Sequence, residues 1–191
     1  QKYVKMAADK DHLESSFLYG MLLIQGIGVD QNKNEAAHYF KKSAEKGHVN
    51  SMHYYGMMLL NGDGIEKNKK EAIKFIKMAA DKGHLESSFY YALMKHKGED
   101  VEIDQEVAAS YFKKAAEKGH TNSMYFYGMM LLNGEGIEMN KKEAGKFLKL
   151  ASEKGNVNSM NSYAMMLIKG DGIEMDKKEA LKYFKMAADN G

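Results

Sequence analysis

The sequence predicts an all-α solenoid of antiparallel helix pairs. Three observations carry this prediction. A pattern recurs every 36 residues along the 191-residue chain, each period contains two stretches with helical apolar spacing, and each period closes on a glycine. A fixed period of this size is typical of solenoids, in which each repeat stacks only on its neighbours. The closing glycines are Gly47, Gly83, Gly119, Gly155 and Gly191.

The closing glycines set the repeat boundaries. We expect five repeats that together form one solenoid domain, with residues 1–11 the second-helix remnant of a preceding repeat. Because Gln1 falls inside a helix-like segment, we also expect the chain to be part of a longer protein. The five repeats are 12–47, 48–83, 84–119 (atypical), 120–155 and 156–191.

The second repeat illustrates the predicted first helix. Residues 50–60 have apolar side chains on one helical face, and the helix breaks at residues 61–64. Two glycines, Gly62 and Gly64, supply the positive φ angles that a tight turn needs. The apolar positions are Met52, Tyr55, Met58 and Leu59.

A capping box marks the start of the second helix. Asn68 lies three residues before Glu71. In a capping box the side chain of each residue accepts the backbone N–H of the other, so that two unpaired N–H groups are satisfied. The box recurs as Asn32/Glu35, Asn140/Glu143 and Asp176/Glu179, and Asp104 facing Val107 keeps half of it. Behind the cap, an apolar face precedes the closing Gly83. Its residues are Ala72, Phe75, Ile76 and Ala79.

Composition excludes several classes of protein. Net charge is only +2 and every basic residue is Lys. Nucleic-acid readers usually concentrate Arg with aromatics on one basic face, so we expect no nucleic-acid partner. No apolar run approaches the roughly 18 residues of a membrane span, and we expect no membrane insertion. The absence of cysteine fits a reducing compartment. We therefore expect an intracellular, cytoplasmic protein.

We interpret the candidate metal-binding and catalytic residues as structural ones. His12, His48, His84 and His120 begin successive repeats, but residues one repeat apart lie about 10 Å apart, too far to share a metal ion. The Asn-Gly-Asp-Gly turn lacks the ligand pattern of a calcium loop. Ser-x-x-Lys spacings lack the companion motifs of serine acyl enzymes. We expect no enzyme activity, no metal and no cofactor.

The repeat resembles the Sel1-like repeat, a relative of the tetratricopeptide repeat. The resemblance implies a right-handed α/α superhelix that serves as a scaffold for protein complexes, and such arrays also occur beside kinase and other catalytic domains. Tyr replaces the family's Leu before the first-helix glycine, which we interpret as a swap of large and small core partners. In the second repeat the matching residues are Ser51, Tyr55-Gly56, Leu59, Gly62-Asp63-Gly64-Ile65, Asn68, Ala72, Phe75, Ala79-Ala80 and Gly83.

The predicted binding surface is the concave face lined by the first helices. The fourth, eighth and twelfth residues of each repeat face the core, and the third, sixth, tenth, thirteenth and fourteenth share the opposite face. The core set is nearly constant whereas the other set varies, as a specific surface would; the alternative is a solvated face free to drift. Amides can bond a peptide backbone and aromatics can anchor it. The candidates are Glu14, Phe17, Asn50, His53, Asn61, Glu86, Phe89, Asn122, Tyr125, Asn133, Asn158, Asn161 and Lys169.

The third repeat departs most from the pattern. Ala92 replaces the first-helix glycine, Lys95-His96-Lys97 replaces Leu-Leu-Asn, and Asp100 replaces the second turn glycine. Asp tolerates the left-handed conformation, and Lys95 has to extend its ammonium group from a core position to water. We add His96 and Lys97 to the candidates as a cationic site for an acidic partner segment; the alternative is a degenerate repeat.

The sequence thus predicts a scaffold or adaptor that binds a protein or peptide along its first helices. Two alternatives stay open: an accessory array of a larger protein such as a kinase, and a module that assembles end to end through uncapped solenoid ends. Met-Met pairs such as Met57-Met58 place one side chain in the core and one near the groove, and we favour core packing as their role.

Overall fold

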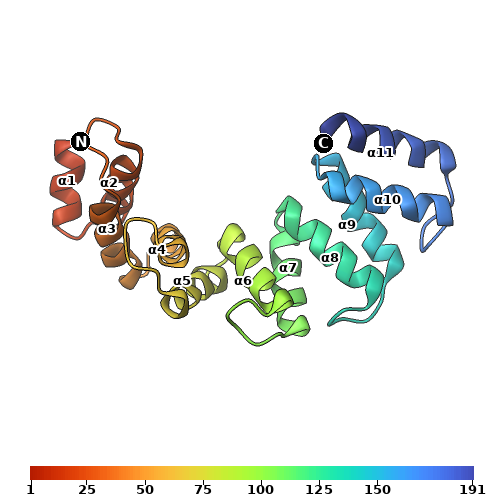
Figure 1. The fold of residues 1–191 in the computed structure, drawn as a ribbon, viewed down its shortest axis with the longest axis horizontal. Coiled ribbons are helices and arrows are strands. Elements are labelled where there is room, and N and C mark those ends of the chain that lie inside the picture. The colour runs from red at the N-terminus through yellow and green to blue at the C-terminus, as the bar shows by residue number, and fades with distance from the viewer. The chain divides into compact units, whose positions relative to one another are not determined.

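A computed structural model describes all residues 1–191, which form eleven α-helices and no strand (Figure 1). The prediction of an all-α repeat fold is confirmed. The chain divides into two compact units, Gln1–Tyr91 and Ala92–Gly191, with the division inside the third repeat. The helices are α1 (Lys2–Asp9), α2 (Leu13–Gln25), α3 (Lys33–Glu45), α4 (Val49–Asn61), α5 (Lys69–Asp81), α6 (Leu85–Lys97), α7 (Gln105–Glu117), α8 (Thr121–Asn133), α9 (Lys141–Glu153), α10 (Val157–Lys169) and α11 (Lys177–Asn190).

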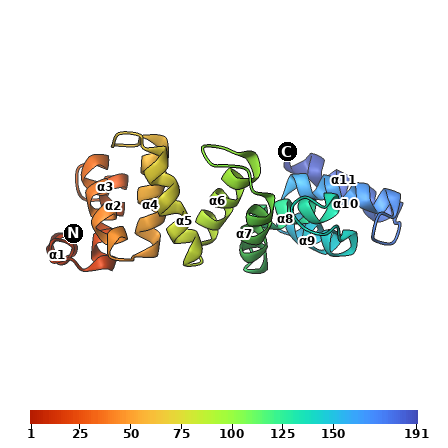
Figure 2. The ribbon, with the colours of Figure 1, turned by 90° about the horizontal axis from the view of Figure 1, so that it is seen from below.

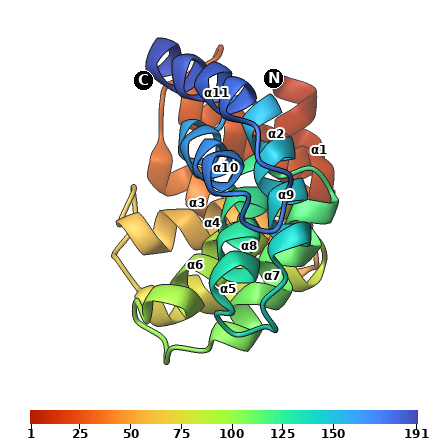
Figure 3. The same ribbon diagram turned by 90° about the vertical axis from the view of Figure 1, so that its right-hand side faces the viewer.

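Each helix packs on its neighbours in the chain. In the first unit, the helices α1 to α5 contact one another in sequential pairs, and Figure 2 shows α2, α3, α4 and α5 following one another. In the second unit, α7 to α11 do the same, and Figure 3 shows α9, α10 and α11 stacked. Helices α10 and α11 run antiparallel (Figure 1). Each full repeat is therefore a helix pair, as the two apolar stretches predicted.

The second helices begin at the predicted caps, with one difference. The Asn32 side-chain oxygen accepts the Glu35 N–H at 3.0 Å, and the same bond recurs at the other caps, including Asp104 to Val107. The return bond of the box is absent, because the Asn32 N–H donates to the Leu23 carbonyl of the first helix at 3.0 Å. The Glu35 carboxylate instead accepts from the Asn32 amide at 3.3 Å. The cap thus ties the two helices of one repeat together.

The repeated histidines cap the first helices. The Nδ1 atoms of His12, His48, His84 and His120 each accept the N–H of the serine three residues later, at 3.2 Å. In the last repeat Asn156 makes the same bond to Ser159 at 2.8 Å. A side-chain acceptor at this position satisfies a helix N–H that has no backbone partner. The predicted structural role of these histidines at the start of each repeat agrees with this geometry.

The two glycines of each turn have different roles: the first ends the helix, and the second contacts the preceding repeat. The first glycine, for example Gly170, ends the first helix at φ 65°. The second sits against the preceding repeat: a Cβ added at Gly172 would lie 2.7 Å from the backbone carbon of Lys141, the first residue of α9. Asp171, between the two glycines, accepts from the Lys141 ammonium group at 2.8 Å. At the corresponding place in the third repeat, Asp100 adopts φ 60°, as predicted.

Aromatic rings fill the core within each repeat. The first-helix tyrosine packs edge-on against a ring of its own second helix, as in Tyr19 on Tyr39 and Tyr55 on Phe75, both with centroids 4.9 Å apart. A lysine of the preceding second helix lies over the same tyrosine; Lys41 Nζ is 6.0 Å from the Tyr55 centroid. The first-helix tyrosine is therefore a core residue of each repeat.

Candidate partner-binding surface

The predicted surface residues fall into an exposed set and a half-buried set. All candidates at the third and fourteenth positions are exposed, which agrees with the predicted outward orientation. The sixth-position residues are half-buried, except for the exposed Asn161. The exposed third- and fourteenth-position residues are Glu14, Asn50, Glu86, Asn122, Asn158, Asn61, Lys97, Asn133 and Lys169, and the half-buried residues are Phe17, His53, Phe89 and Tyr125.

The sixth-position rings pack between successive first helices. The Phe17 centroid on α2 lies 5.2 Å from that of His48 and 5.6 Å from that of Tyr54. His53 on α4 stacks on His84 with centroids 4.4 Å apart. These side chains therefore hold neighbouring repeats together as well as lining the surface. Sequence reasoning assigned them to binding alone because the helical period does not show what the next repeat covers.

A polar contact that the sequence reasoning missed links the third residue of one repeat to the cap of the next. His48 Nε2 lies 3.1 Å from the Glu14 carboxylate, and the Asn156 amide donates to the Asn122 oxygen at 3.1 Å. Both pairs are separated by 34 residues. This constant offset is the signal that could have revealed them. The pairs align neighbouring first helices along the exposed surface.

The His53–His84 pair carries no charge near neutral pH. Burial, and then the neighbouring His84, lower the pKa of His53 to about 4. Burial also lowers the pKa of His84, against the opposing effect of Glu86. His53 Nδ1 lies 2.9 Å from the Ser87 hydroxyl, and His84 Nδ1 accepts the Ser87 N–H. Protonation of either ring would place a charge in this half-buried contact between α4 and α6.

We predict a loss of stability in mild acid that depends on this pair. The pKa of His53 is lower in the folded chain than its unfolded value of 6.5. The contribution of neutral His53 to the free energy of unfolding is therefore complete above pH 6.5 and is lost as the pH falls towards 4. We expect the free energy of urea unfolding to fall by about 2 kcal/mol more in the wild type than in His53→Phe between pH 7 and pH 4.5. Phe89 stands at the corresponding position, so a ring is compatible there. Equal losses in both proteins would contradict this role of His53.

The side chains of the third-repeat cluster each have a local partner. The Lys95 ammonium group reaches out of its core position and donates to the Glu102 carbonyl at 3.3 Å, as predicted for a lysine at this place. Lys97 lies 3.6 Å from the Glu99 carboxylate. His96 Nδ1 lies 2.7 Å from the Gln105 side-chain oxygen, and the ring packs on Phe112 and Phe126. The proposed cationic site stays a prediction, and these contacts would have to rearrange to form it.

An open pocket of about 260 Å³ lies between the first helices α8 and α10. Its walls are methionine and leucine side chains, and its rim carries one lysine and one aspartate. Met165 is 43% exposed, whereas its neighbour Met166 is buried. The Met pair thus divides between core and surface as the sequence predicted. The lining residues are Met129, Leu132, Ser162, Met165, Met166, Lys169 and Asp171.

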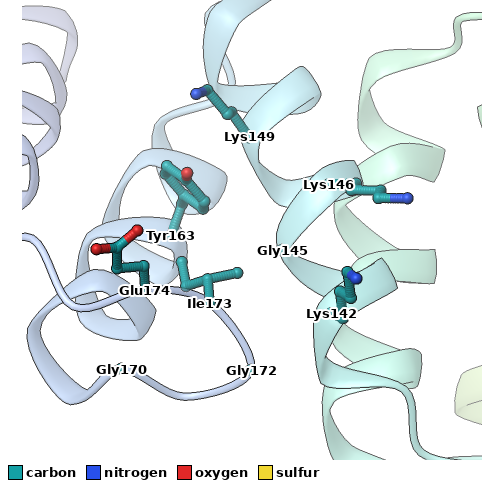
Figure 4. Close-up of a pocket in the computed structure, with 9 residues that line it drawn as sticks. All are labelled: Lys142, Gly145, Lys146, Lys149, Tyr163, Gly170, Gly172, Ile173 and Glu174. Carbon is teal, nitrogen blue, oxygen red and sulfur yellow. The ribbon is translucent and has the colours of Figure 1, made fainter.

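A second pocket of about 550 Å³ lies beside α9 and the turn after α10 (Figure 4). Gly145 adjoins it, because a Cβ there would lie 2.7 Å from the Ile173 side chain. Its lysines do not converge: Figure 4 shows Lys146 pointing away from Tyr163 and Glu174. Lys149 lies 3.6 Å from the Glu179 carboxylate. The pocket therefore presents no concentrated charge.

No group of three or more His, Asp or Glu side chains is arranged to hold a metal ion. None of the eleven helices has the length and apolar character needed to cross a membrane.

On helix α11, Leu181 is 69% exposed, whereas Ala37 and Ala109 at the corresponding positions are buried. The predicted end-to-end contact, which stays a prediction, would involve this face.

The helix pairs, their 36-residue period and the inter-repeat contacts define a helical repeat protein. The Sel1 repeat family matches almost the whole chain, and the chain belongs to this family. The family description places five repeats one residue later than the glycine-based boundaries. Its matched segments are 13–48, 49–84, 85–120, 121–156 and 157–191.

Solved structures of Sel1 repeat proteins are similar to this chain. A Sel1 repeat protein from Oxalobacter formigenes is 26% identical with a TM-score of 0.88, over 95% of this chain and 75% of that one. The protective antigen c5321 of uropathogenic Escherichia coli, which displays this fold, is 25% identical with a TM-score of 0.92. That match covers 100% of this chain but only 41% of the antigen. The sequence matches no curated protein.

Proposed function

We propose that this chain is a protein-interaction scaffold that docks a peptide or partner domain on its first-helix face, meaning the surface formed by the third, sixth, tenth, thirteenth and fourteenth residues of each repeat. Sel1 repeat proteins generally act as such scaffolds. One observation supports the choice of face. The fourth and eighth residues are Ser and Tyr in every repeat, whereas the exposed residues opposite them differ from repeat to repeat. Core packing keeps the first set constant, whereas the exposed side chains of the second set can vary and so specify a partner.

Residues of the second unit support this proposal. Asn122, Asn158 and Asn161 are exposed on α8 and α10, the two first helices that line the pocket with Met129 and Met165. Amide groups can bond the backbone of an extended segment, and an adaptable apolar pocket can take up a side chain. A surface that combines the two suits a peptide better than a small polar ligand.

A charge-matched pair of variants tests the proposal. Asn158→Glu with Asn161→Glu changes the net charge by −2 on the first-helix face, and Lys146→Glu makes the same change on the second helix α9. We expect the double variant to weaken capture of a partner from the protein's own cells about tenfold, because it alters the contact surface itself. Partner recovery is measured by quantitative mass spectrometry and confirmed with the purified partner.

The control variant Lys146→Glu should capture the partner as well as the wild type does. If it loses the partner to the same extent, the effect is one of net charge. If the double variant retains full capture, the partner binds elsewhere. Either result would overturn the assignment to the first-helix face.

A further inference from the structure

The seventh residue of each repeat is large in every repeat except the last. This position carries Leu18, Tyr54, Tyr90 and Phe126 in the first four repeats and Ser162 in the fifth. The Tyr54 ring stacks on Phe40 of the preceding second helix with centroids 5.5 Å apart. Within the second unit, Phe126 stacks on Phe112 with centroids 5.1 Å apart. The same rings also meet the preceding first helix, with Tyr54 5.6 Å from the Phe17 centroid and Phe126 6.1 Å from the His96 centroid. The fold thus has a place for an aromatic ring against both helices of the preceding repeat, and the last repeat does not fill it with its own side chain.

Ser162 lines the pocket between α8 and α10. Met129 on α8 and Met165, one turn further along α10, also line the pocket. Their flexible thioether chains adapt to flat rings and make favourable sulfur–aromatic contacts. The pocket volume of about 260 Å³ is large enough for one aromatic side chain. The wall is predominantly apolar, so its occupant is an apolar group and not a polar metabolite.

The rim of the pocket carries one uncompensated charge. Asp171 is neutralised by Lys141 at 2.8 Å. Lys169 is exposed and forms no ion pair with a carboxylate of the chain. An occupant with a carboxylate a few ångströms from its ring would therefore complement both the apolar wall and the rim.

We propose that this pocket binds an aromatic side chain of a protein partner, beside the position that Tyr54 and Phe126 occupy in their own repeats, and that an adjacent acidic residue of the partner pairs with Lys169. The identity of the occupant as part of a protein rests on the proposed function. The pocket itself can be tested without any partner, so the two proposals can fail separately.

The test uses two small probes and methionine methyl NMR. Protein labelled with ¹³C at its methionine methyl groups is titrated with 3-phenylpropanoate and with the uncharged 3-phenylpropanamide. We expect saturable shifts of the Met129, Met165 and Met166 methyl signals at millimolar probe concentrations, since a probe this small has few atoms to contribute. The carboxylate probe should bind about two- to fivefold more tightly than the amide, which is the effect of one exposed ion pair.

Variants assign the effect to the pocket. Ser162→Phe restores the ring of the other repeats and should abolish saturable binding, whereas Ser162→Ala keeps the space open and should retain it. Met165→Asp, at an exposed site, places a negative charge in the apolar wall and serves as the second blocked variant if Ser162→Phe fails to fold. Lys169→Gln should make the two probes bind equally, and the exposed Lys154→Gln should not change the preference.

Three outcomes would overturn the inference. They are the absence of saturable shifts at these methyl groups in the wild type, undiminished binding in both blocked variants, and equally tight binding of hexanoate, which carries a carboxylate but no ring. None of these outcomes affects the test of the first-helix face with a protein partner.

Discussion

Phe40→Ala should lower the free energy of unfolding by about 3–5 kcal/mol, the range observed when a large aromatic side chain is removed from a core. Phe40 on α3 is 0% exposed. Its ring stacks on Tyr54 and lies 5.9 Å from the Phe17 centroid, and it fills the space that a side chain at Gly20 would need. It therefore joins the two helices of its own repeat to the first helix of the next. Chemical unfolding followed by circular dichroism measures the loss.

The conservative variant Phe40→Leu is the control, because it retains most of the side-chain volume that Phe40→Ala removes. Leu148 occupies the corresponding place in the fourth repeat and is fully buried there. We expect Phe40→Leu to cost about 1–2 kcal/mol, since most of the volume is retained. In Phe40→Ala, hydrogen exchange should quicken in α2, α3 and α4 and not in α10 and α11, because repeats contact only their neighbours. Uniform loss of protection along the chain would contradict this localisation.

Gly172→Ala should cost about 2–4 kcal/mol, more than an ordinary glycine substitution. Two effects add. Gly172 has φ 78°, where a Cβ is strained, and its added Cβ would lie 2.7 Å from backbone carbon of Lys141. Backbone cannot swing aside as the end of a side chain can. Thermal and urea unfolding of the purified variant give the measurement.

Two other glycines provide matched controls. Gly155 has φ 89° with nothing within 4 Å of an added Cβ, and Gly170 has φ 65° with no atom closer than 3.5 Å. Alanine at either site meets only the conformational cost, which is about 1 kcal/mol. If Gly172→Ala were no more costly than these controls, the contact between the turn and α9 would not contribute to stacking.

The fold was largely predictable because its determinants are local and repeated. The period, the helix pair, the caps such as Asn68 and the left-handed Asp100 all follow from short-range patterns. The histidine caps were recognised as turn residues, but not as acceptors for a serine N–H. The prediction of a return bond in the capping box was wrong, because the Asn32 N–H donates to the Leu23 carbonyl of the first helix. That contact depends on how the loop folds back, which spacing alone does not encode.

The candidate surface was predictable only in part. Helical periodicity placed Asn122 and Lys169 on an exposed face, and both lie there. It could not show that His53 is half-covered by the next repeat, because that contact joins residues 31 positions apart in sequence. Sequence reasoning also missed the pocket beside Ser162. The signal was present in the sequence, because the seventh residue is large in the first four repeats and small in the fifth. A search for positions where one repeat has a smaller residue than the others would have found it.

The contact between the second turn glycine and the start of the preceding second helix also constrains how such a protein can change in length. Gly172 and Lys141 meet across a repeat boundary, and Gly64 meets Lys33 in the same way. Duplication or deletion of a whole 36-residue segment recreates this junction unchanged. Insertion of a single residue between the turn and the helix would shift the glycine away from its neighbour. We therefore expect the array to tolerate the gain or loss of a whole repeat, and an insertion within the turn to destabilise the stack.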